Sequence, residues 1–338
     1  MLREDESMFF LGVDAGGTKT IAALTNRRGE LLGIGLSGPC NILENGEETV
    51  RENLREAIAS FKEILQENRE KIYSCFGLPA VGEFRNSQDV MKEIVKRETG
   101  IEPNMVVNDV VVGWAAGTLT QDGVHVVAGT GAIIYGRKSN NEVRVSGWGS
   151  LIGDEGSAYD IGRRALSVIT KQLDGRLPRS ILSDLIMEKN ELKDEIDLLE
   201  WVYKNPTTRR QKIASVAPLV YDAALKGDTF AKDILYNAAE ELALAATTAA
   251  RRLELMNPLF TYSGSVLENN KIVRERFCEI LLDSFPTATI RRTSLPPVFG
   301  AILLSYKIAL GRIDESFLEA LKKASEKIEQ SHQNQVYF

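Results

Sequence analysis

Residues 9–24 read FFLGVDAGGTKTIAAL, which is an apolar strand, a glycine turn and a second apolar strand. Consecutive glycines let a tight turn expose backbone N–H groups without side-chain obstruction, and such a turn forms an anion-binding concavity. The turn also offers two hydroxyl donors and a cation; its residues are Asp14, Ala15, Gly16, Gly17, Thr18, Lys19 and Thr20. Asp14, at the end of the first strand, is suited to hold Mg²⁺ through water. A plain glycine hairpin has the same local sequence, so both interpretations stay open here.

A second apolar strand and glycine turn begin near residue 123. Val124–Ala128, the turn Gly129-Thr130-Gly131 and the strand Ala132–Tyr135 repeat the order of the opening. The match is architectural rather than residue by residue. It predicts two related halves whose hairpins face each other and clamp the β- and γ-phosphates of a nucleotide, although a plain hairpin again fits the short motif.

The bulk composition limits the class of protein. At 338 residues the chain is long enough for about two domains. The net charge of −6 provides no basic field for nucleic acid or anionic lipid. Cys40, Cys75 and Cys278 are far apart in sequence, which argues against a disulfide framework or a zinc ribbon. The apolar run Met8–Val13 is too short for a signal or membrane segment, so we expect a cytoplasmic protein.

Strands that alternate with helical periods over the first 119 residues indicate the α/β class. A 3.6-residue apolar period from Val50 to Leu65 predicts a helix, and Asn104–Val107 predicts a short strand. After Ser157 the chain becomes mostly helical, and its clearest helix is Thr229–Met256, which Asp228 can cap. We expect an N-terminal domain over residues 1–119, on which a helix within 312–338 packs back, and a larger domain over 120–311.

Three further segments carry candidate chemistry. Asp109 follows a strand and begins a helix, where it can act as a helix cap or as a general base that accepts a proton from an attacking hydroxyl. The stretch 147–157 reads GWGSLIGDEGS and combines dense glycines with two acids before a helix. Its acids can favour the positive helix N-terminus or accept hydrogen bonds from a ligand. The turn Gly264-Ser265 is either an ordinary strand-to-helix connection or part of an adenosine pocket.

These motifs, in this order, resemble those of the N-acetylglucosamine kinase and BadF/BadG ATPase branch of the actin–hexokinase–Hsp70 superfamily. The resemblance covers residues 8 to 312, and the run from Gly153 to Tyr159 (GDEGSAY) is especially similar. It implies a two-domain ribonuclease H-like (actin-like ATPase) fold with a central cleft. It also implies an ATP-dependent sugar kinase that uses ATP and Mg²⁺ and acts on a small-molecule sugar. Whether the protein is a homodimer stays open.

The resemblance also implies roles for individual residues. Asp109 would be the base and Asp14 the carboxylate on the magnesium side. Gly264 and Ser265 would approach the adenosine. The sugar-pocket positions would be Asn41, Gly147, Trp148, Asp154 and, through its proton transfer, Asp109.

One departure concerns the acceptor sugar. N-acetylglucosamine kinases of this type usually have Ser-Asn after the second glycine turn, whereas this chain has Ala132-Ile133. Recognition of an N-acetyl group is therefore in doubt, and glucose, glucosamine or another hexose stays open.

Two other functions fit parts of the pattern. The same branch includes ATP-driven activators of acyl-CoA dehydratases and reductases, which hold an iron–sulfur cluster by cysteines between subunits. Cys40, Cys75 and Cys278 are not obviously placed for that cluster. Non-catalytic sugar sensors on related folds carry a DNA-binding helix-turn-helix ahead of the first strand, and only seven residues precede Met8 here.

Overall fold

The computed structural model describes residues 8–205 and 208–335, with side chains described up to residue 326. The chain divides into two compact units. Unit 1 comprises the residues up to Gln121 together with those from Thr293 onward, and unit 2 comprises Asp122–Arg292. This division differs from the expected boundary at residue 311. Helix α14 (Pro297–Leu310) belongs to unit 1 because it packs on α5 (Asp109–Thr118) and on the first strand, β1 (Phe9–Ala15).

Unit 1 is built on a five-stranded sheet in the order β3-β2-β1-β4-β5. β1 pairs antiparallel with β2, which pairs antiparallel with β3, whereas β1, β4 and β5 run parallel to one another. The remaining strands are β2 (Thr20–Asn26), β3 (Leu31–Ser37), β4 (Ile72–Gly77) and β5 (Met105–Val107). The remaining helices are α1 (Ile42–Asn45), α2 (Glu47–Ala57), η2 (Ala59–Phe61), α3 (Lys62–Glu67), η3 (Arg69–Lys71), α4 (Ser87–Thr99) and α15 (Glu315–Gln335).

Unit 2 repeats this topology in its own five-stranded sheet, ordered β10-β9-β6-β7-β8. β6 pairs antiparallel with β7 and parallel with β9, as β1 does with β2 and β4. The strands are β6 (Gly123–Ala128), β7 (Ala132–Lys138), β8 (Asn141–Ser146), β9 (Leu259–Ser263) and β10 (Thr289–Arg292). The internal repeat expected from the two glycine turns is thus present in the strand order.

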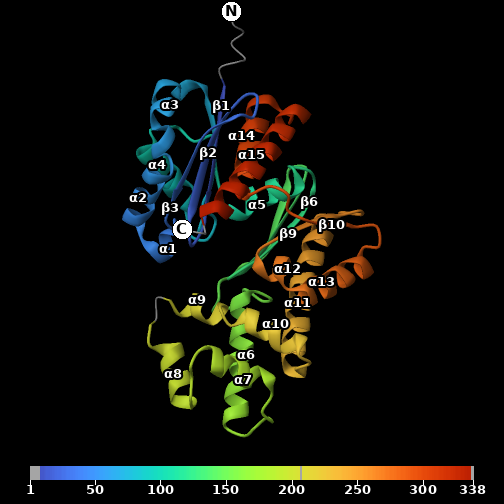
Figure 1. Cartoon of the computed structure of the whole chain (residues 1–338). Helices are drawn as coiled ribbons and strands as arrows, with labels where there is room; N and C mark the ends of the chain where they lie inside the picture. Colours follow the sequence, from blue (N-terminus) through green and yellow to red (C-terminus); the bar gives the residue numbers. More distant parts are fainter. Residues whose placement is uncertain (1–7, 206–207, 336–338) are drawn as a thin grey trace, which may run out of the picture. The chain divides into compact units, whose positions relative to one another are not determined.

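Helices make up most of the rest of unit 2, from α6 to α13 (Figure 1). Their bounds are α6 (Ala158–Leu173), α7 (Ile181–Lys189), α8 (Glu195–Tyr203), α9 (Arg209–Ala214), α10 (Ala217–Leu225), α11 (Thr229–Arg252), α12 (Ser265–Asn269) and α13 (Lys271–Ser284). Asp228 accepts a hydrogen bond from the Ala231 N–H and caps α11, as the sequence predicted. With its mixed sheet and this strand order in each unit, the fold is α/β and ribonuclease H-like, which confirms the expected fold class.

The alternation of side chains along β1 gives unit 1 a core on each face of its sheet. Leu11 and Val13 are fully buried in the core that includes residues of α2 and α4. Phe10, which precedes Leu11 in the strand, is buried in the other core with Tyr306 of α14 and Phe317 of α15. Figure 1 shows the two helical layers, with α2 to α4 on one face and α14 and α15 on the other. The C-terminal helix is therefore held on unit 1 by aromatic packing.

One expected helix is divided in the structure. The apolar period from Val50 to Leu65 becomes α2, the single turn η2 and α3. A β-carbon at Gly35 of β3 would overlap the carbonyl oxygen of Ala57, where α2 ends. The close approach of helix and strand at this glycine coincides with the break, although the buried positions Val50, Leu54, Phe61 and Leu65 keep the predicted face.

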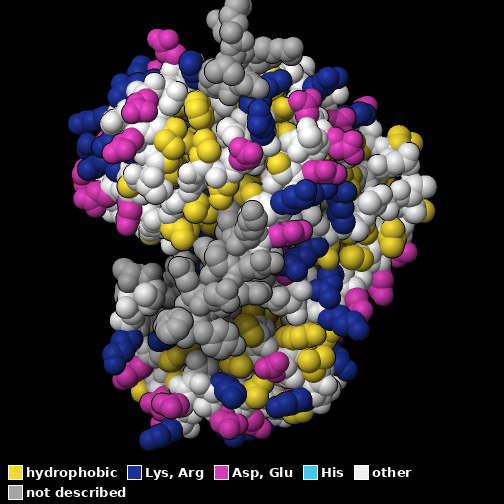
Figure 2. Space-filling view, turned by 45° about the horizontal axis from the view of Figure 1, so that its top comes forward, with side chains coloured by type: hydrophobic (Ala, Val, Ile, Leu, Met, Phe, Trp, Pro, Cys, Tyr) yellow, Lys and Arg dark blue, Asp and Glu magenta, His cyan; other side chains and the backbone are white. Residues whose placement is uncertain are grey.

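Charged side chains of both signs occur across the face shown in Figure 2, consistent with the modest net charge of the chain. Within the described ranges, no helix combines the length and the apolar character needed to cross a membrane.

Candidate active site

The first glycine turn joins β1 to β2 in unit 1. The Gly16 N–H donates to the Lys19 carbonyl over 2.9 Å and closes the turn. Gly17, Thr18 and Lys19 are exposed. Neither glycine of the turn has a positive φ, so each contributes through the absence of a side chain rather than through a special backbone conformation. The backbone of this turn and Lys19 are therefore accessible, and anion binding at the turn stays a prediction.

Thr20 behaves differently from the rest of the turn. Its side chain is fully buried, and its hydroxyl donates to the Gly38 carbonyl over 2.8 Å and contacts the Cys40 sulfur at 3.1 Å. These contacts fasten β2 to the segment after β3. The Thr20 hydroxyl is therefore directed into the unit, to Gly38 and Cys40, rather than towards a nucleotide.

Asp14 and Asp109 lie at the same edge of the unit 1 sheet. In the parallel pairing of the strands, Asp14 is opposite Gly77 of β4, and Gly77 is opposite Val107 of β5. Asp109 follows Val107 by two residues. Burial and, after it, the charge of Asp109 raise the pKa of the Asp14 carboxyl to about 7, against the opposing charge of Lys19. The two carboxylates are thus close enough to interact. Carboxylate oxygens are the ligands that Mg²⁺ takes in proteins, and a cation would relieve this repulsion, so the edge fits the metal predicted at Asp14.

Asp109 is the first residue of α5, and its neighbour Asn108 is the helix cap. The Asn108 side chain accepts from the Val110 N–H and donates to the Val81 carbonyl. The capping role that the sequence left open for Asp109 is therefore filled by Asn108. Helix α5 packs closely against α14. A β-carbon at Gly300 of α14 would overlap the Val112 carbonyl oxygen, so the two helix backbones are in contact at this glycine. This packing places the half-buried Asp109 carboxylate where the parallel strands end.

Asn41 lies beside the first glycine turn. The Cys40 N–H donates to the Gly16 carbonyl over 3.1 Å, which ties the segment before Asn41 to the turn. The Asn41 side-chain oxygen accepts from the Leu43 N–H and caps the short helix α1. Unit 1 therefore gathers Asp14, the glycine turn and Asn41 in one region, although they are up to 27 positions apart in sequence (14 to 41).

The second glycine turn joins β6 to β7 in unit 2 and is held by the start of α6. The Gly129 N–H donates to the Gly131 carbonyl. The carbonyls of Gly129 and Thr130 accept from the N–H groups of Ala158 and Tyr159. The motif around Ser157 thus has a structural role as well: it supplies the helix N-terminus that fastens the turn.

Gly264 brings the β9–α12 connection against this turn. Its φ is +96°, and a β-carbon there would stand 2.9 Å from the Gly129 nitrogen. Glycine is needed on both counts, because an L side chain rarely adopts this conformation and would also collide with the turn. The two segments that the sequence assigned to nucleotide binding in this half are therefore adjacent in space.

A cavity of about 340 Å³ opens beside these two segments. Thr130 and Ser265, both predicted to bind nucleotide, line it. Its other walls come from α6, α9, α10 and α12, and its polar side chains are Gln211, Ser215, Tyr221, Asn269 and Asn270. These polar residues carry no recognisable sequence signal, because α9 and α10 contain no glycine motif and Tyr221 follows an ordinary helical pattern.

Asp154 is a buried carboxylate with 3% of its surface exposed. Its φ is +60°, a conformation that few non-glycine residues adopt. The Ala132 N–H donates to it, and the Arg210 guanidinium forms an ion pair with it at 2.7 Å. Burial raises the pKa of its carboxyl, while the charge of Arg210 is the largest opposing influence. Asp154 therefore connects its own loop to the second turn and to α9.

The loop before Asp154 is exposed. Trp148 is 72% exposed, so its side chain does not belong to the core of unit 2. Leu151 and Ile152 are exposed as well. Gly147 has a φ of +73°, and a β-carbon there would stand 2.7 Å from the Ile133 side chain. Ile133, one of the two residues that depart from the amino-sugar kinase pattern, thus lies against the predicted sugar-side loop.

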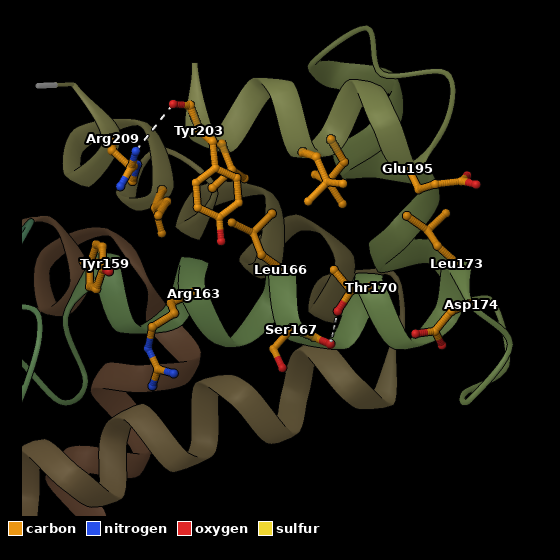
Figure 3. A pocket seen from close by; sticks show the side chains of 14 residues that line it. Tyr159, Arg163, Leu166, Ser167, Thr170, Leu173, Asp174, Glu195, Tyr203 and Arg209 are labelled. Carbon is orange, nitrogen blue, oxygen red and sulfur yellow. Dashed lines mark hydrogen bonds between the residues drawn. The ribbon is translucent and has the colours of Figure 1, made fainter. Parts of the chain in front are cut away.

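A larger cavity of about 580 Å³ lies elsewhere in unit 2 (Figure 3). Its walls come from α6, α8 and α9, and they are mostly apolar, with Arg163, Arg209 and Glu195 among the charged residues. No residue that the sequence assigned to a site lines it. Size therefore does not identify the site here, and the smaller cavity beside the glycine turn is the better candidate.

Known proteins are similar to this chain over most of its length. The model of the BadF/BadG/BcrA/BcrD ATPase family matches residues 11–305. An N-acetylmuramic acid/N-acetylglucosamine kinase of Clostridium acetobutylicum is 31% identical over 301 residues, which cover 88% of this chain and 98% of that protein. An N-acetyl-D-glucosamine kinase of Dictyostelium discoideum is 30% identical over 311 residues, which cover 88% of this chain and 97% of that one.

A solved structure supports the fold. The crystal structure of a candidate N-acetylglucosamine kinase from Chromobacterium violaceum aligns with a TM-score of 0.69 at 23% identity. The alignment covers 88% of this chain and 99% of that one.

Proposed function

The chain belongs to the BadF/BadG/BcrA/BcrD ATPase family and is an ATP-dependent sugar kinase, and we propose that it transfers the γ-phosphate of ATP in line to a hydroxyl of a hexose or amino sugar. The acceptor classes are N-acetylglucosamine, glucosamine and glucose. The observation that carries the proposal is the carboxylate pair Asp14 and Asp109 at one sheet edge, beside an exposed glycine turn.

Unit 1 would supply the acid–base chemistry. Asp109 would accept the proton of the attacking hydroxyl, which is the role of an aspartate in protein kinases. Asn41, tied to the same region through Cys40, would contact the sugar. Gly16, Gly17, Thr18 and Lys19 would hold phosphate oxygens. Asp14 would hold Mg²⁺ through water, and the ion, when bound, neutralises charge that develops on the phosphates.

Unit 2 would supply the nucleotide pocket and part of the sugar pocket. The cavity beside Thr130 and Ser265 has a volume of about 340 Å³, within the range of small-molecule sites. Gly129 and Gly131 flank Thr130 and would approach the phosphates. The exposed Trp148, with Gly147 and Asp154, would contact the sugar.

The acceptor class depends on Ala132 and Ile133. The Ala132 N–H is used by Asp154, and the Ile133 side chain packs near Gly147. Neither residue has a polar side chain for the N-acetyl group, whereas two relatives are named for N-acetylated sugars. We therefore expect any N-acetyl group to be recognised by other residues or not at all.

An ADP-release assay tests the proposal. The purified protein, ATP and Mg²⁺ are combined with glucose, glucosamine, N-acetylglucosamine or N-acetylmuramic acid, each beside a reaction without sugar. We expect ADP release that depends on at least one sugar, with a sugar phosphate detected by mass spectrometry. ATP hydrolysis that no sugar increases would contradict the kinase and would favour the activator ATPases of the same family.

A further inference from the structure

We infer that Arg210 is a positioning residue for Asp154 and holds its carboxylate, in charged form, against the second glycine turn. The inference rests on the proposed function, because it takes Asp154 as a contact of the sugar. Arg210 acts through Asp154 rather than on a substrate.

The geometry places Arg210 and Asp154 as one group beside the turn. Nη2 of Arg210 is 2.7 Å from Oδ2 of Asp154, and the Ala132 N–H donates to the same carboxyl. A β-carbon on Gly131 would stand 2.6 Å from Arg210 Nη2 and 2.9 Å from Asp154 Oδ2. The ion pair therefore packs directly on Gly131, and the carboxylate is held from two sides, by β7 and by α9.

Helix α9 is itself held firmly enough to position a side chain. A β-carbon on Gly162 of α6 would overlap the Ile213 carbonyl oxygen, so the backbones of α6 and α9 touch at this glycine. Ile213 is buried in the core of unit 2. The helix that carries Arg210 is thus packed backbone to backbone on the helix whose N-terminus fastens the glycine turn.

The charges around Asp154 favour this role. The Asp154 side chain is 4% exposed and that of Arg210 is 34% exposed. Burial raises the pKa of the Asp154 carboxyl, Arg210 and the Ala132 N–H lower it, and Glu155 in the same loop raises it. Among the described residues that act on this pKa, Arg210 is the cation. Without Arg210, a buried carboxyl beside Glu155 would take up a proton at higher pH.

The preceding residue offers a matched control. Arg209 lies over the Tyr203 ring at 5.2 Å and donates to the Tyr203 carbonyl (Figure 3). It lines the larger cavity and not the turn. Arg209→Ala therefore removes the same charge from the same helix and leaves the contacts of Asp154 in place.

The experiment measures steady-state kinetics from pH 5 to 9 for wild type, Arg210→Ala, Arg210→Lys and Arg209→Ala, with the best sugar from the panel. In Arg210→Ala we expect the KM for the sugar to rise roughly 10- to 100-fold, with the KM for ATP within about twofold. In the pH profile of kcat/KM for the sugar, the acid limb should move to higher pH by about 1 to 3 units. Sugar binding needs the Asp154 carboxylate, because a protonated carboxyl is a poor acceptor of hydrogen bonds from the sugar hydroxyls. In Arg210→Lys the acid limb should lie closer to that of wild type. Arg209→Ala should have the same KM values and the same acid limb as wild type.

An unchanged acid limb in Arg210→Ala, or a rise in the KM for ATP alone, would overturn the inference. Thermal unfolding reports whether Arg210→Ala folds. If this variant does not fold, Arg210→Lys must show a raised KM for the sugar, with an acid limb of kcat/KM close to that of wild type. If wild type phosphorylates no sugar, the proposed function fails. Sugar turnover with an acid limb in Arg210→Ala that matches wild type refutes only the inference.

Discussion

Gly264 lies so close to Ala128 that a β-carbon on it would stand 2.6 Å from the Ala128 carbonyl carbon. This contact joins the β9–α12 connection to the end of β6. It places Ser265 and Thr130 on the wall of the same cavity, of about 340 Å³. A substitution at Gly264 therefore tests whether this junction forms the nucleotide pocket.

Gly264→Ala should destabilise the protein and weaken ATP binding. The substitution adds a steric collision, which costs about 1–3 kcal/mol, to the strain of a positive φ. Gly227→Ala is the matched control, since Gly227 has a φ of +95° with no atom within 4 Å of the added carbon. Denaturant midpoints and the KM for ATP should change more in Gly264→Ala, and equal changes in the two variants would show that the collision is relieved.

Asp109→Asn should lower kcat by about 10²–10⁴ and leave the KM for ATP nearly unchanged. The amide cannot accept the proton, while the helix cap at Asn108 stays in place. Asp89→Asn removes an exposed carboxylate from the first turn of α4 and controls for loss of a favourable helix-dipole interaction. Turnover that is as high in Asp109→Asn as in Asp89→Asn would remove Asp109 as the base.

His125 should make unit 2 less stable as the pH falls. The ring is fully buried between Thr261 and Ser263 of β9, and burial lowers its pKa to about 3. The unfolded chain binds a proton near pH 6.5 and the folded protein does not. Stability from this group is therefore complete above pH 6.5 and declines as the pH falls towards 3.

The comparison for His125 is His125→Gln, which keeps polar contacts but cannot titrate. Between pH 6.5 and 4, wild type should lose roughly 1.4 kcal/mol per pH unit more than the variant. Denaturant unfolding at several pH values measures the difference. Parallel stability curves for the two proteins would mean that His125 protonates without unfolding.

Cys278 should react with iodoacetamide before the other thiols. Cys40 and Cys75 are fully buried, and burial raises the pKa of both. Cys278, in unit 2, is only partly buried. Peptide mass spectrometry of briefly labelled native protein should show modification at Cys278, with all three sites modified after unfolding. Rapid labelling of Cys40 and Cys75 in native protein would mean that they are accessible, as cluster ligands at a subunit interface would have to be.

The strands, the two glycine turns and the strand-to-helix site of Asp109 were predictable because their signals are local. An apolar run with a period of two, a glycine pair or a capping residue acts within a few positions of the chain. The repeated order of strand, turn and strand also predicted the shared topology of the two sheets. The resemblance of the motifs to the BadF/BadG branch was confirmed by the family match over residues 11–305.

Long-range packing set the remaining features, because local periodicity does not say which buried surfaces meet. Helix α14 joins unit 1 only because its apolar face meets β1 and also α5, which ends about 180 residues earlier in the chain (Thr118 to Pro297). The Thr20 hydroxyl turns inward to Gly38. Arg210 reaches Asp154 across 56 positions, on a helix with no motif of its own. A side chain's partner depends on the approach of two backbones, here at Gly162 and Ile213, and that approach exists only in the folded chain.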